Sequence, residues 1–307
     1  MNWENNFDYL TINPPSSNFR SDIIDLDNLP KVSFCIPTFN SSRTLEMCLK
    51  SILDQEYPDI EIIIADNGSK DNSVEIARRY TDKVYFDDGL LGSVRQTTVE
   101  HSKGEILAIF DSDIYIPHKK WLLNAIIYFN FSNKVSTIWP RNEAPPESSW
   151  TTKLYFNLWE IIIEHRIKDK KNIFGGGNAL FLRECIDEIG GINRSIHWGE
   201  DFEWAKNLKK RGYQVVAIDD PLYHDTMHSI KEFARKQFVG SKTFTKEGFE
   251  LMGLSFRDLI YENTVLGIKH MLIGLFIKRD PSWLIFPVFI AMRALGYGFS
   301  YIKQNYD

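Results

Sequence analysis

The sequence predicts an α/β protein in which a mostly parallel sheet is covered by helices on both faces and is followed by a helical C-terminal tail. Three observations lead to this prediction. From Lys31 onward, short apolar runs alternate with amphipathic segments. Polar residues follow several of the apolar runs, and two long apolar stretches lie near the C-terminal end. Strands that alternate with helices indicate parallel pairing with both faces of the sheet covered.

The apolar runs predict buried strands and the amphipathic segments predict helices. Expected strands cover residues 32–37, 60–66, 83–86, 105–111, 135–139 and 214–219. Expected helices cover 44–55, 73–80, 91–101 and 121–129. One face of the first helix carries Leu45, Cys48, Leu49, Ile52 and Leu53.

The composition is that of an ordinary globular protein, with 43% hydrophobic and 25% charged residues in a chain of 307. It excludes a disordered or collagen-like chain. A formal net charge of −5 argues against a general nucleic-acid-binding protein, so no nucleic-acid partner is expected. The charge is unevenly distributed: residues 226–307 hold 11 Lys/Arg and 7 Asp/Glu, and residues 1–225 hold 25 and 34. An acidic body is therefore joined to a basic tail.

Two carboxylates follow the strand expected over 105–111. Asp111 and Asp113 are one residue apart, so both can meet a hard divalent cation such as Mg²⁺ or Mn²⁺. The ion would bridge them to a diphosphate and neutralise the charge that develops on a leaving group. A solvated acidic turn or a helix N-cap explains the same residues, because a lone D-x-D has many chance matches.

Other polar residues also follow expected strands, and ligands of such sheets bind at the carboxyl ends of the strands. Residues 38–40 follow the first strand, and residues 66–71 follow the second. The carboxylate of Asp66 can accept a hydrogen bond from a base or a ribose. The same turn can equally cap the next helix through Ser69 or Asp71.

The second half of the chain contributes further candidates, each with an ordinary structural explanation. Three glycines at 175–177 allow a backbone to approach a ligand closely, or they form a flexible turn. Glu200 and Asp201 open a helix, where acidic residues commonly complement the helix dipole. His224 follows the strand over 214–219 and is by default a surface or core histidine.

Together and in this order, these motifs resemble those of family 2 inverting glycosyltransferases with the GT-A nucleotide-sugar fold. PTFN at 37–40 and DNGSKD at 66–71 resemble the ends of the family's first two strands. GSVRQ at 92–96 resembles the segment whose arginine lies near the nucleotide, and FDSD at 110–113 resembles the D-x-D strand. GGGNALFLRE at 175–184 and WGEDFEW at 198–204 resemble the acceptor-side block and its E-D motif. The resemblance covers about Lys31 to Gly240.

The resemblance implies a nucleotide-binding role for one group of residues and a catalytic role for another. The residues that would line the nucleotide pocket are Pro37, Thr38, Asn40, Asn67 and Ser112. Asp66 would bind the base, Arg95 would lie near the base or the diphosphate, and Asp111 would contact the ribose or the metal. Asp113 would be the principal ligand of Mg²⁺ or Mn²⁺, with His224 facing the metal or the diphosphate. Asp201 would be the general base and Glu200 its acidic neighbour.

The expected reaction transfers a sugar from a nucleotide diphosphate, with a UDP-sugar favoured over a GDP-sugar, to a glycan or polyprenol-linked acceptor. Asn67 departs from the family pattern, because many members have a second Asp there. No Q-x-x-R-W follows the E-D motif, which argues against a processive cellulose- or chitin-type synthase. A polyprenyl-phosphate sugar synthase and a non-catalytic glycan- or lipid-binding protein remain alternatives. A nucleotidyltransferase is disfavoured, because PTFNSSR is not a glycine-rich basic loop.

The C-terminal tail is expected to touch a membrane. Its apolar stretches cover 264–277 and 282–302; the first is short for a bilayer span, and Pro287 and Arg293 interrupt the second. Interfacial or re-entrant helices between 264 and 302 therefore fit better than two spans, although a packed helical hairpin or a dimer interface fits as well. The basic residues Arg141, Lys153 and Arg166 could meet a lipid phosphate.

The expected organisation is an N-terminal extension or loosely packed arm over 1–30, a GT-A domain over 31–240 and a helical, membrane-associated segment over 241–307. Three scattered cysteines without metal-type spacing favour a reducing compartment. The first ten residues carry neither a basic nor an apolar region, so a signal peptide is not expected. The expected location is the cytoplasm, at the cytoplasmic face of the membrane.

Overall fold

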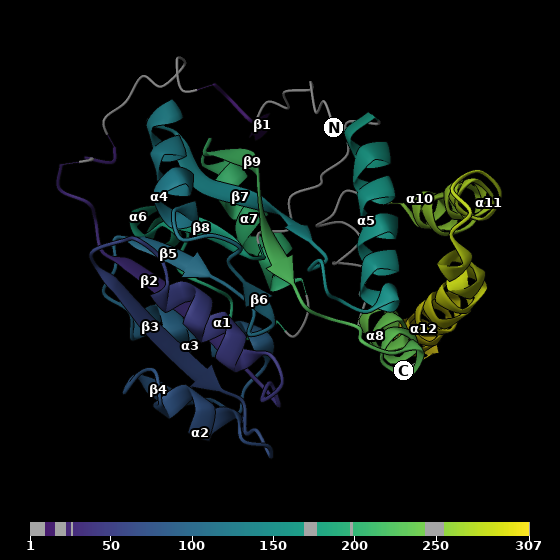
Figure 1. Ribbon diagram of the computed structural model, residues 1–307, viewed down its shortest axis with the longest axis horizontal. Coiled ribbons are helices and arrows are strands. Elements are labelled where there is room, and N and C mark those ends of the chain that lie inside the picture. Colours follow the sequence, from purple (N-terminus) through teal and green to yellow (C-terminus); the bar gives the residue numbers. More distant parts are fainter. Residues whose placement is uncertain are drawn as a thin grey trace. The chain divides into compact units, whose positions relative to one another are not determined.

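The computed structural model describes residues 10–15, 23–25, 27–168, 177–196, 199–242 and 255–306. The chain divides into two compact units (Figure 1). The first, which we call the sheet unit, comprises Met1–Glu143 and Phe174–His224. The second, which we call the helical unit, comprises Ala144–Ile173 and Asp225–Asp307.

One sheet organises the sheet unit. Its described strands lie in the order β1-β9-β7-β8-β5-β2-β3-β4, and the short strand β6 pairs with β9. The strands are β1 Leu10–Ile12, β2 Val32–Thr38, β3 Ile60–Asp66, β4 Val84–Phe86, β5 Ile106–Ile109, β6 Ile114–Tyr115, β7 Val135–Glu143, β8 Ala179–Leu182 and β9 Gln214–His224. β8 runs antiparallel to β5 and β7, and β6 runs antiparallel to β9, whereas the other pairs are parallel. The expected mostly parallel sheet is confirmed.

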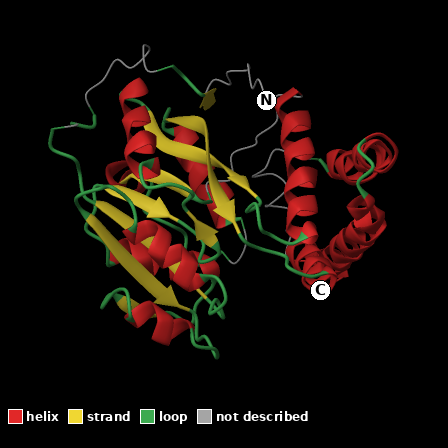
Figure 2. Ribbon diagram, in the orientation of Figure 1, coloured by secondary structure: helices red, strands yellow, loops and turns green. Residues whose placement is uncertain are grey.

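The register of the central strands aligns the strand ends that carry polar groups. β2 pairs with β3 so that Thr38 lies opposite Asp66, and β2 also pairs with β5. All seven residues of β2 are buried, as expected for a central parallel strand covered on both faces. Figure 2 shows helices in front of and behind these strands. The helices are α1 Leu45–Leu53, α2 Ser73–Arg78, α3 Leu91–Glu100, α4 Trp121–Ile126, α6 Arg183–Glu188 and α7 Glu200–Lys210, and a 3₁₀ turn, η2 Ile127–Phe131, continues α4.

Three local expectations differ from the structure. Leu53, expected on the apolar face of α1, is 54% exposed, because it lies at the edge of that stripe in the last turn. Neither Ser69 nor Asp71 is the N-cap of α2; Asn72 holds that position, and Asp71 accepts a hydrogen bond from the Ser73 amide instead. Within the expected loose arm, β1 pairs in parallel with β9 and buries Leu10.

The helical unit is built from one long helix and a broken helical hairpin. Its described elements are α5 Trp150–Lys168, α8 Ile230–Lys242, α10 Phe256–Tyr261, η3 Glu262–Leu266, α11 Gly267–Leu272, η4 Ile273–Ile277, η5 Pro281–Ile285 and α12 Phe286–Tyr306. Both η3 and η4 are π-helical, whereas η5 is a 3₁₀ helix. Its core consists of Leu154, Leu158, Met227, Phe233, Trp283, Ile285, Phe286 and Phe289.

Two glycines allow the hairpin to close. A Cβ on Gly267 would lie 2.0 Å from Cζ of Phe286, and one on Gly274 would lie 2.3 Å from Cδ1 of Trp283. Real carbon atoms cannot approach so closely, so both positions require glycine if the rings are to pack against this helix. The two apolar stretches of the tail therefore pack on each other inside the helical unit.

Two arginines of the helical unit have partners within it. Arg166, one of the basic residues expected to meet a lipid phosphate, forms a buried two-pronged ion pair with Glu262, at 2.8 and 2.9 Å. Arg293 donates to Tyr297 Oη at 2.5 Å and lies over the Phe289 ring. Among the described residues, one helical stretch, Pro281–Phe299, has the length and apolar composition needed to cross a membrane, and 28% of it is buried.

Candidate functional site

The loops after β2 and β3 are tied to each other at the carboxyl edge of the sheet. Asp66 is buried, and its carboxylate accepts hydrogen bonds from the Gly68 and Ser69 amides at 2.9 Å and from Ser69 Oγ at 2.5 Å. Asn40 has a left-handed backbone, with φ of 49°, and its side chain accepts from the Lys70 amide at 2.8 Å. These bonds make the two loops one rigid rim.

Two other nucleotide-pocket candidates are placed at the same rim. Asn67 donates through Nδ2 to the carbonyl oxygens of Asp87 and Gly89, at 2.7 and 3.0 Å. Thr38 is 2% exposed, and its hydroxyl has no hydrogen-bond partner among the described residues. An unpaired buried hydroxyl is costly, so this oxygen is a natural contact for a ligand atom.

Asp111 follows β5 and is held by two side chains that come from distant parts of the sequence. Arg95 of α3 donates through Nη2 to Asp111 Oδ1 at 2.7 Å. Asn178, just before β8, donates through Nδ2 to Asp111 Oδ2 at 3.2 Å and accepts from the Asp111 amide at 2.8 Å. Both carboxylate oxygens of Asp111 therefore have fixed donors, and the neighbouring Ser112 hydroxyl lies 2.6 Å from that of Ser41.

A pairing between short strands places Asp113 beside His224. β6 begins at Ile114, and its antiparallel register with β9 sets Ile114 opposite His224. His224 Nε2 consequently lies 3.0 Å from Asp113 Oδ1. Single ligand atoms of Asp111, Asp113 and His224 all lie within 4.8 Å of one another. Two carboxylates and an imidazole at such distances form a donor set that suits Mn²⁺ or Mg²⁺.

Glu200 and Asp201 occupy the first turn of α7, as expected. Glu200 is 3% exposed, and its Oε1 lies 3.2 Å from Arg95 Nε. Asp201 is partly exposed, and a Cβ on Gly177 would lie 3.5 Å from its Oδ2. Burial, and then the Glu200 carboxylate, raise the pKa of Asp201 well above its usual value against the opposing effect of Arg95.

The predicted site residues therefore fall into one connected group in the sheet unit. Arg95 touches both Asp111 and Glu200, which links the D-x-D loop to the E-D helix. The residue that sequence reasoning missed is Asn178, whose only signal was its place at the end of the glycine run. Gly175 and Gly176 lie outside the described residues, as does Trp198.

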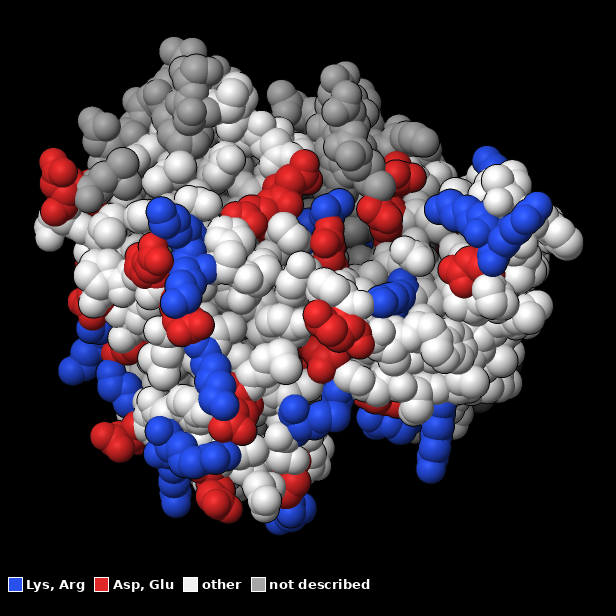
Figure 3. Space-filling model, in the orientation of Figure 1, with Lys and Arg blue, Asp and Glu red and all other residues white. Residues whose placement is uncertain are grey.

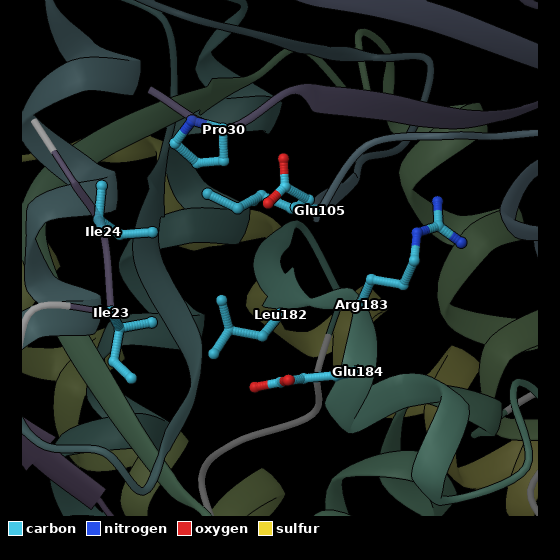
Figure 4. Close-up of a pocket in the computed structure, with 8 residues that line it drawn as sticks. Ile23, Ile24, Pro30, Glu105, Leu182, Arg183 and Glu184 are labelled. Atoms are coloured by element: carbon cyan, nitrogen blue, oxygen red, sulfur yellow. The ribbon is translucent and has the colours of Figure 1, made fainter. Parts of the chain in front are cut away.

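A separate cavity opens at the other end of β5 (Figure 4). It lies between Ile23 and Ile24 on one side and Leu182 and Glu184 on the other, with Pro30 at its rim. None of the predicted site residues lines it.

Solved structures identify the fold. The mannosyltransferase PcManGT from Pyrobaculum calidifontis, in complex with GDP-Man and Mn²⁺, superimposes with a TM-score of 0.59 at 16% identity, covering 90% of this chain and 88% of that chain. Glucosyl-3-phosphoglycerate synthase from Mycobacterium tuberculosis, in complex with Mg²⁺ and UDP, gives 0.53 at 13% identity, covering 74% and 80%. The fold is therefore the GT-A fold.

The sequence itself defines the family. The model of glycosyl transferase family 2 matches residues 33–190, so the chain belongs to that family and is a glycosyltransferase. Glycosyltransferase AglE of Haloferax volcanii is 27% identical over 220 residues, covering 68% of this chain and 71% of the relative. EpsJ of Bacillus subtilis, an uncharacterized glycosyltransferase, is 33% identical over 234 residues, covering 68% and 65%.

A third relative is much longer than the matched region. Chondroitin synthase of Pasteurella multocida is 28% identical over 240 residues, which is 63% of this chain and 24% of that protein. The chain therefore shares with it one catalytic-type segment rather than its whole architecture.

Proposed function

We propose that the protein is a metal-dependent inverting glycosyltransferase that moves a sugar from a nucleotide diphosphate to an acceptor hydroxyl. The observation that carries the proposal is the connected group of Asp111, Asp113, His224, Glu200 and Asp201 at one edge of the sheet unit. Together with Arg95, which contacts Asp111 and Glu200, this group holds four carboxylates, one imidazole and one guanidinium, so a divalent cation would balance its charge. The cation would neutralise the negative charge that develops on the departing diphosphate.

In the proposed reaction, Asp201 accepts the proton of the acceptor hydroxyl while the hydroxyl oxygen bonds to C1 of the sugar. The bond between C1 and the phosphate oxygen breaks on the opposite face, its electron pair leaves with the nucleoside diphosphate, and the configuration at C1 inverts. A raised pKa suits Asp201 to this task, because a base works best when its pKa lies near the working pH. The negative charge of Glu200 helps to raise the pKa of Asp201 and so supports its proposed role as the base.

The nucleotide is proposed to bind along the rim of β2 and β3. Its contacts would be Pro37, Thr38, Asn40, Asp66, Asn67 and Ser112. The unpaired Thr38 hydroxyl and the partly exposed side chain of Asn67 support this placement. A UDP-sugar is favoured, and a GDP-sugar is the second choice. Asp113 and His224, with Asp111, would hold Mg²⁺ or Mn²⁺.

The acceptor is proposed to be a glycan or a polyprenol-linked sugar at the cytoplasmic face of a membrane. The helical unit supports this, because the segment from η3 to η5 exposes large apolar side chains that we call the apolar stripe: Val265, Ile268, Leu272, Phe276, Ile277 and Leu284. Phe276 is 76% exposed. Lys278 and Arg279, which directly follow Ile277 of the apolar stripe, are exposed cations. Figure 3 shows basic side chains and an acidic one over α10 and α11, and a largely uncharged surface over α12. Such a surface suits an anionic bilayer interface.

The proposed domain organisation keeps 31–240 as the catalytic region and 241–307 as the membrane-associated segment. α5 lies within 31–240 in the sequence but belongs to the helical unit.

The test begins with thermal shifts of the full chain in UDP or GDP with Mn²⁺, followed by turnover of the sugar forms of the better ligand. Asp201→Asn should abolish transfer and leave nucleotide binding intact, whereas the exposed Asp82→Asn should match the wild type. Full activity in excess EDTA would refute metal dependence. Turnover on a polyprenyl phosphate but on no hydroxyl acceptor would show a polyprenyl-phosphate sugar synthase instead.

A further inference from the structure

We infer that Arg95 is a positioning residue that locks the D-x-D loop to the E-D helix and does not bind the diphosphate. The inference rests on the proposed function, because it assigns Arg95 a task inside the proposed site. It concerns the mutual placement of Asp111 and Glu200, two residues separated by 89 positions in the sequence.

The guanidinium of Arg95 is enclosed by protein on all sides. Arg95 is 5% exposed, and its Nη2 donates to Asp111 Oδ1 at 2.7 Å. Its Nε lies 3.2 Å from Glu200 Oε1, and its Cζ lies 5.6 Å from the ring of Trp204, one turn further along α7. Nη1 is also buried and has no hydrogen-bond partner among the described residues, so two of the three guanidinium nitrogens face carboxylates of the protein.

A buried cation needs compensating charge, and here the compensation comes from two different elements. Asp111 is on the loop after β5, Glu200 is at the start of α7, and Arg95 comes from α3. Removing the guanidinium would take from Glu200, which is 3% exposed, the cation that lies 3.2 Å from its Oε1. Neither carboxylate would then be held at its present distance from the other.

The consequence is functional because the two carboxylates belong to different halves of the site. Asp111 belongs to the proposed metal and nucleotide side, and Glu200 precedes the proposed base. An in-line reaction depends on the placement of the base relative to the bound sugar, and a displacement of about 1 Å can cost about 100-fold in rate. Arg95 therefore sets the geometry for the chemical step and not the affinity for the donor.

Arg95→Lys and its control Arg183→Lys separate a positioning role of Arg95 from a role in binding the diphosphate. Arg95→Lys keeps the charge, but one ammonium cannot reproduce the planar fork that reaches two carboxylates. We expect kcat to fall by about 100-fold, with the donor KM and the Kd of the nucleoside diphosphate within about threefold of wild type. A Kd raised tenfold or more for the nucleoside diphosphate, with the monophosphate Kd unchanged, would show that Arg95 binds the diphosphate. An unchanged kcat would also overturn the inference.

Arg183→Lys is the matched control. Arg183 also uses its fork for two bonds, to the Gly104 carbonyl and to Ser102 Oγ at 2.6 Å, but it does so at the cavity end of β5 (Figure 4). We expect this variant to lower Tm and leave kcat within about twofold of wild type. A similar loss of kcat in both variants would reduce the Arg95 effect to general destabilisation.

A double-mutant cycle measured by Tm tests the contact between Arg95 and Glu200 without turnover, and it remains informative if the proposed function fails. Arg95→Met should lower Tm by several degrees. Adding Glu200→Gln should recover part of that loss, because the buried carboxylate that faced the guanidinium is then replaced by a neutral amide. Strict additivity of the two Tm changes would show that Arg95 and Glu200 do not depend on each other. If the wild type binds nucleoside diphosphate and turns over no sugar, the transferase proposal fails while this cycle still decides the bridge.

Discussion

Asn178→Asp is the substitution whose effect follows most directly from the geometry of the site. The change keeps the oxygen that accepts from the Asp111 amide at 2.8 Å. It replaces the donating nitrogen, 3.2 Å from Asp111 Oδ2, with a carboxylate oxygen. A bond to a charged acceptor, worth about 1.5–3 kcal/mol, is thereby exchanged for a repulsion between like charges.

The size of the repulsion can be worked from that distance. Two unit charges 3.2 Å apart repel by about 5 kcal/mol at an effective dielectric constant near 20 and by about 1 kcal/mol in water. Asp111 is about one-third exposed, with 32% of its side chain accessible, so an intermediate value of about 2–3 kcal/mol applies. The repulsion raises the pKa of the introduced carboxyl, and its protonated form can donate to Asp111 as the amide does.

The sign of the pH dependence follows. Because the folded state binds the proton more tightly than the unfolded state, the variant should approach wild-type stability at about pH 5 and lose stability as the pH rises toward about 8. Urea unfolding of both proteins without added metal, at several pH values, measures this difference. A difference that is constant with pH, or that shrinks as the pH rises, would refute the reasoning.

Asn193→Asp provides the matched control. Asn193 Nδ2 also donates to a carboxylate, Glu203 Oε1, at the same 3.2 Å, but both groups are at the surface. Solvent screening limits such a pair to about 0–1 kcal/mol. A control effect as large as that of Asn178→Asp would show that burial around Asp111 does not govern the outcome.

Four further outcomes are expected. Asp201→Asn should raise Tm at pH 8 relative to wild type, because burial and Glu200 disfavour the charged carboxylate; a lower Tm at pH 8 would contradict this. Asp113→Asn should remove the thermal stabilisation by Mn²⁺ that the wild type is expected to show, and stabilisation of equal size in both proteins would exclude Asp113 as a ligand. Arg166→Met should cost about 3–5 kcal/mol in urea unfolding, whereas the double change with Glu262→Leu should cost much less; an equal or larger loss in the double variant would contradict the buried pair. Phe276→Ser with Ile277→Ser should weaken flotation with vesicles of anionic lipid at least tenfold without lowering turnover of a soluble acceptor, and unchanged flotation, or a loss of dimer in its place, would exclude the apolar stripe as the bilayer contact.

Much of the fold follows from local patterns. β3 covers the predicted residues 60–66, and β2, β4 and α3 differ from prediction by a residue at one end, because continuous apolar runs and amphipathic periods are strong local signals. The exposure of Leu53, the N-cap of α2 and its end at Arg78 differ from prediction, because the ends of helices are the least well determined by local sequence. The π-helical segments of the tail were not predicted; Gly274, against which Trp283 packs, lies in η4, and Gly267, against which Phe286 packs, directly follows η3.

The sequence by itself determined the strands β2, β3, β4, β5, β7 and β9, the polar residues at their ends and the family to which they belong, since these depend on neighbours within a few positions; it did not predict β1, β6 or β8. Only the tertiary structure decided which side chains meet. Arg95 lies between Asp111 and Glu200, Asn178 holds Asp111, and the register of β6 against β9 brings His224 to Asp113. Such contacts join residues 16 to more than 100 positions apart in the sequence. They are fixed by the packing of the whole sheet unit, because the periodicity of the sequence does not identify the distant partner of a buried charged side chain.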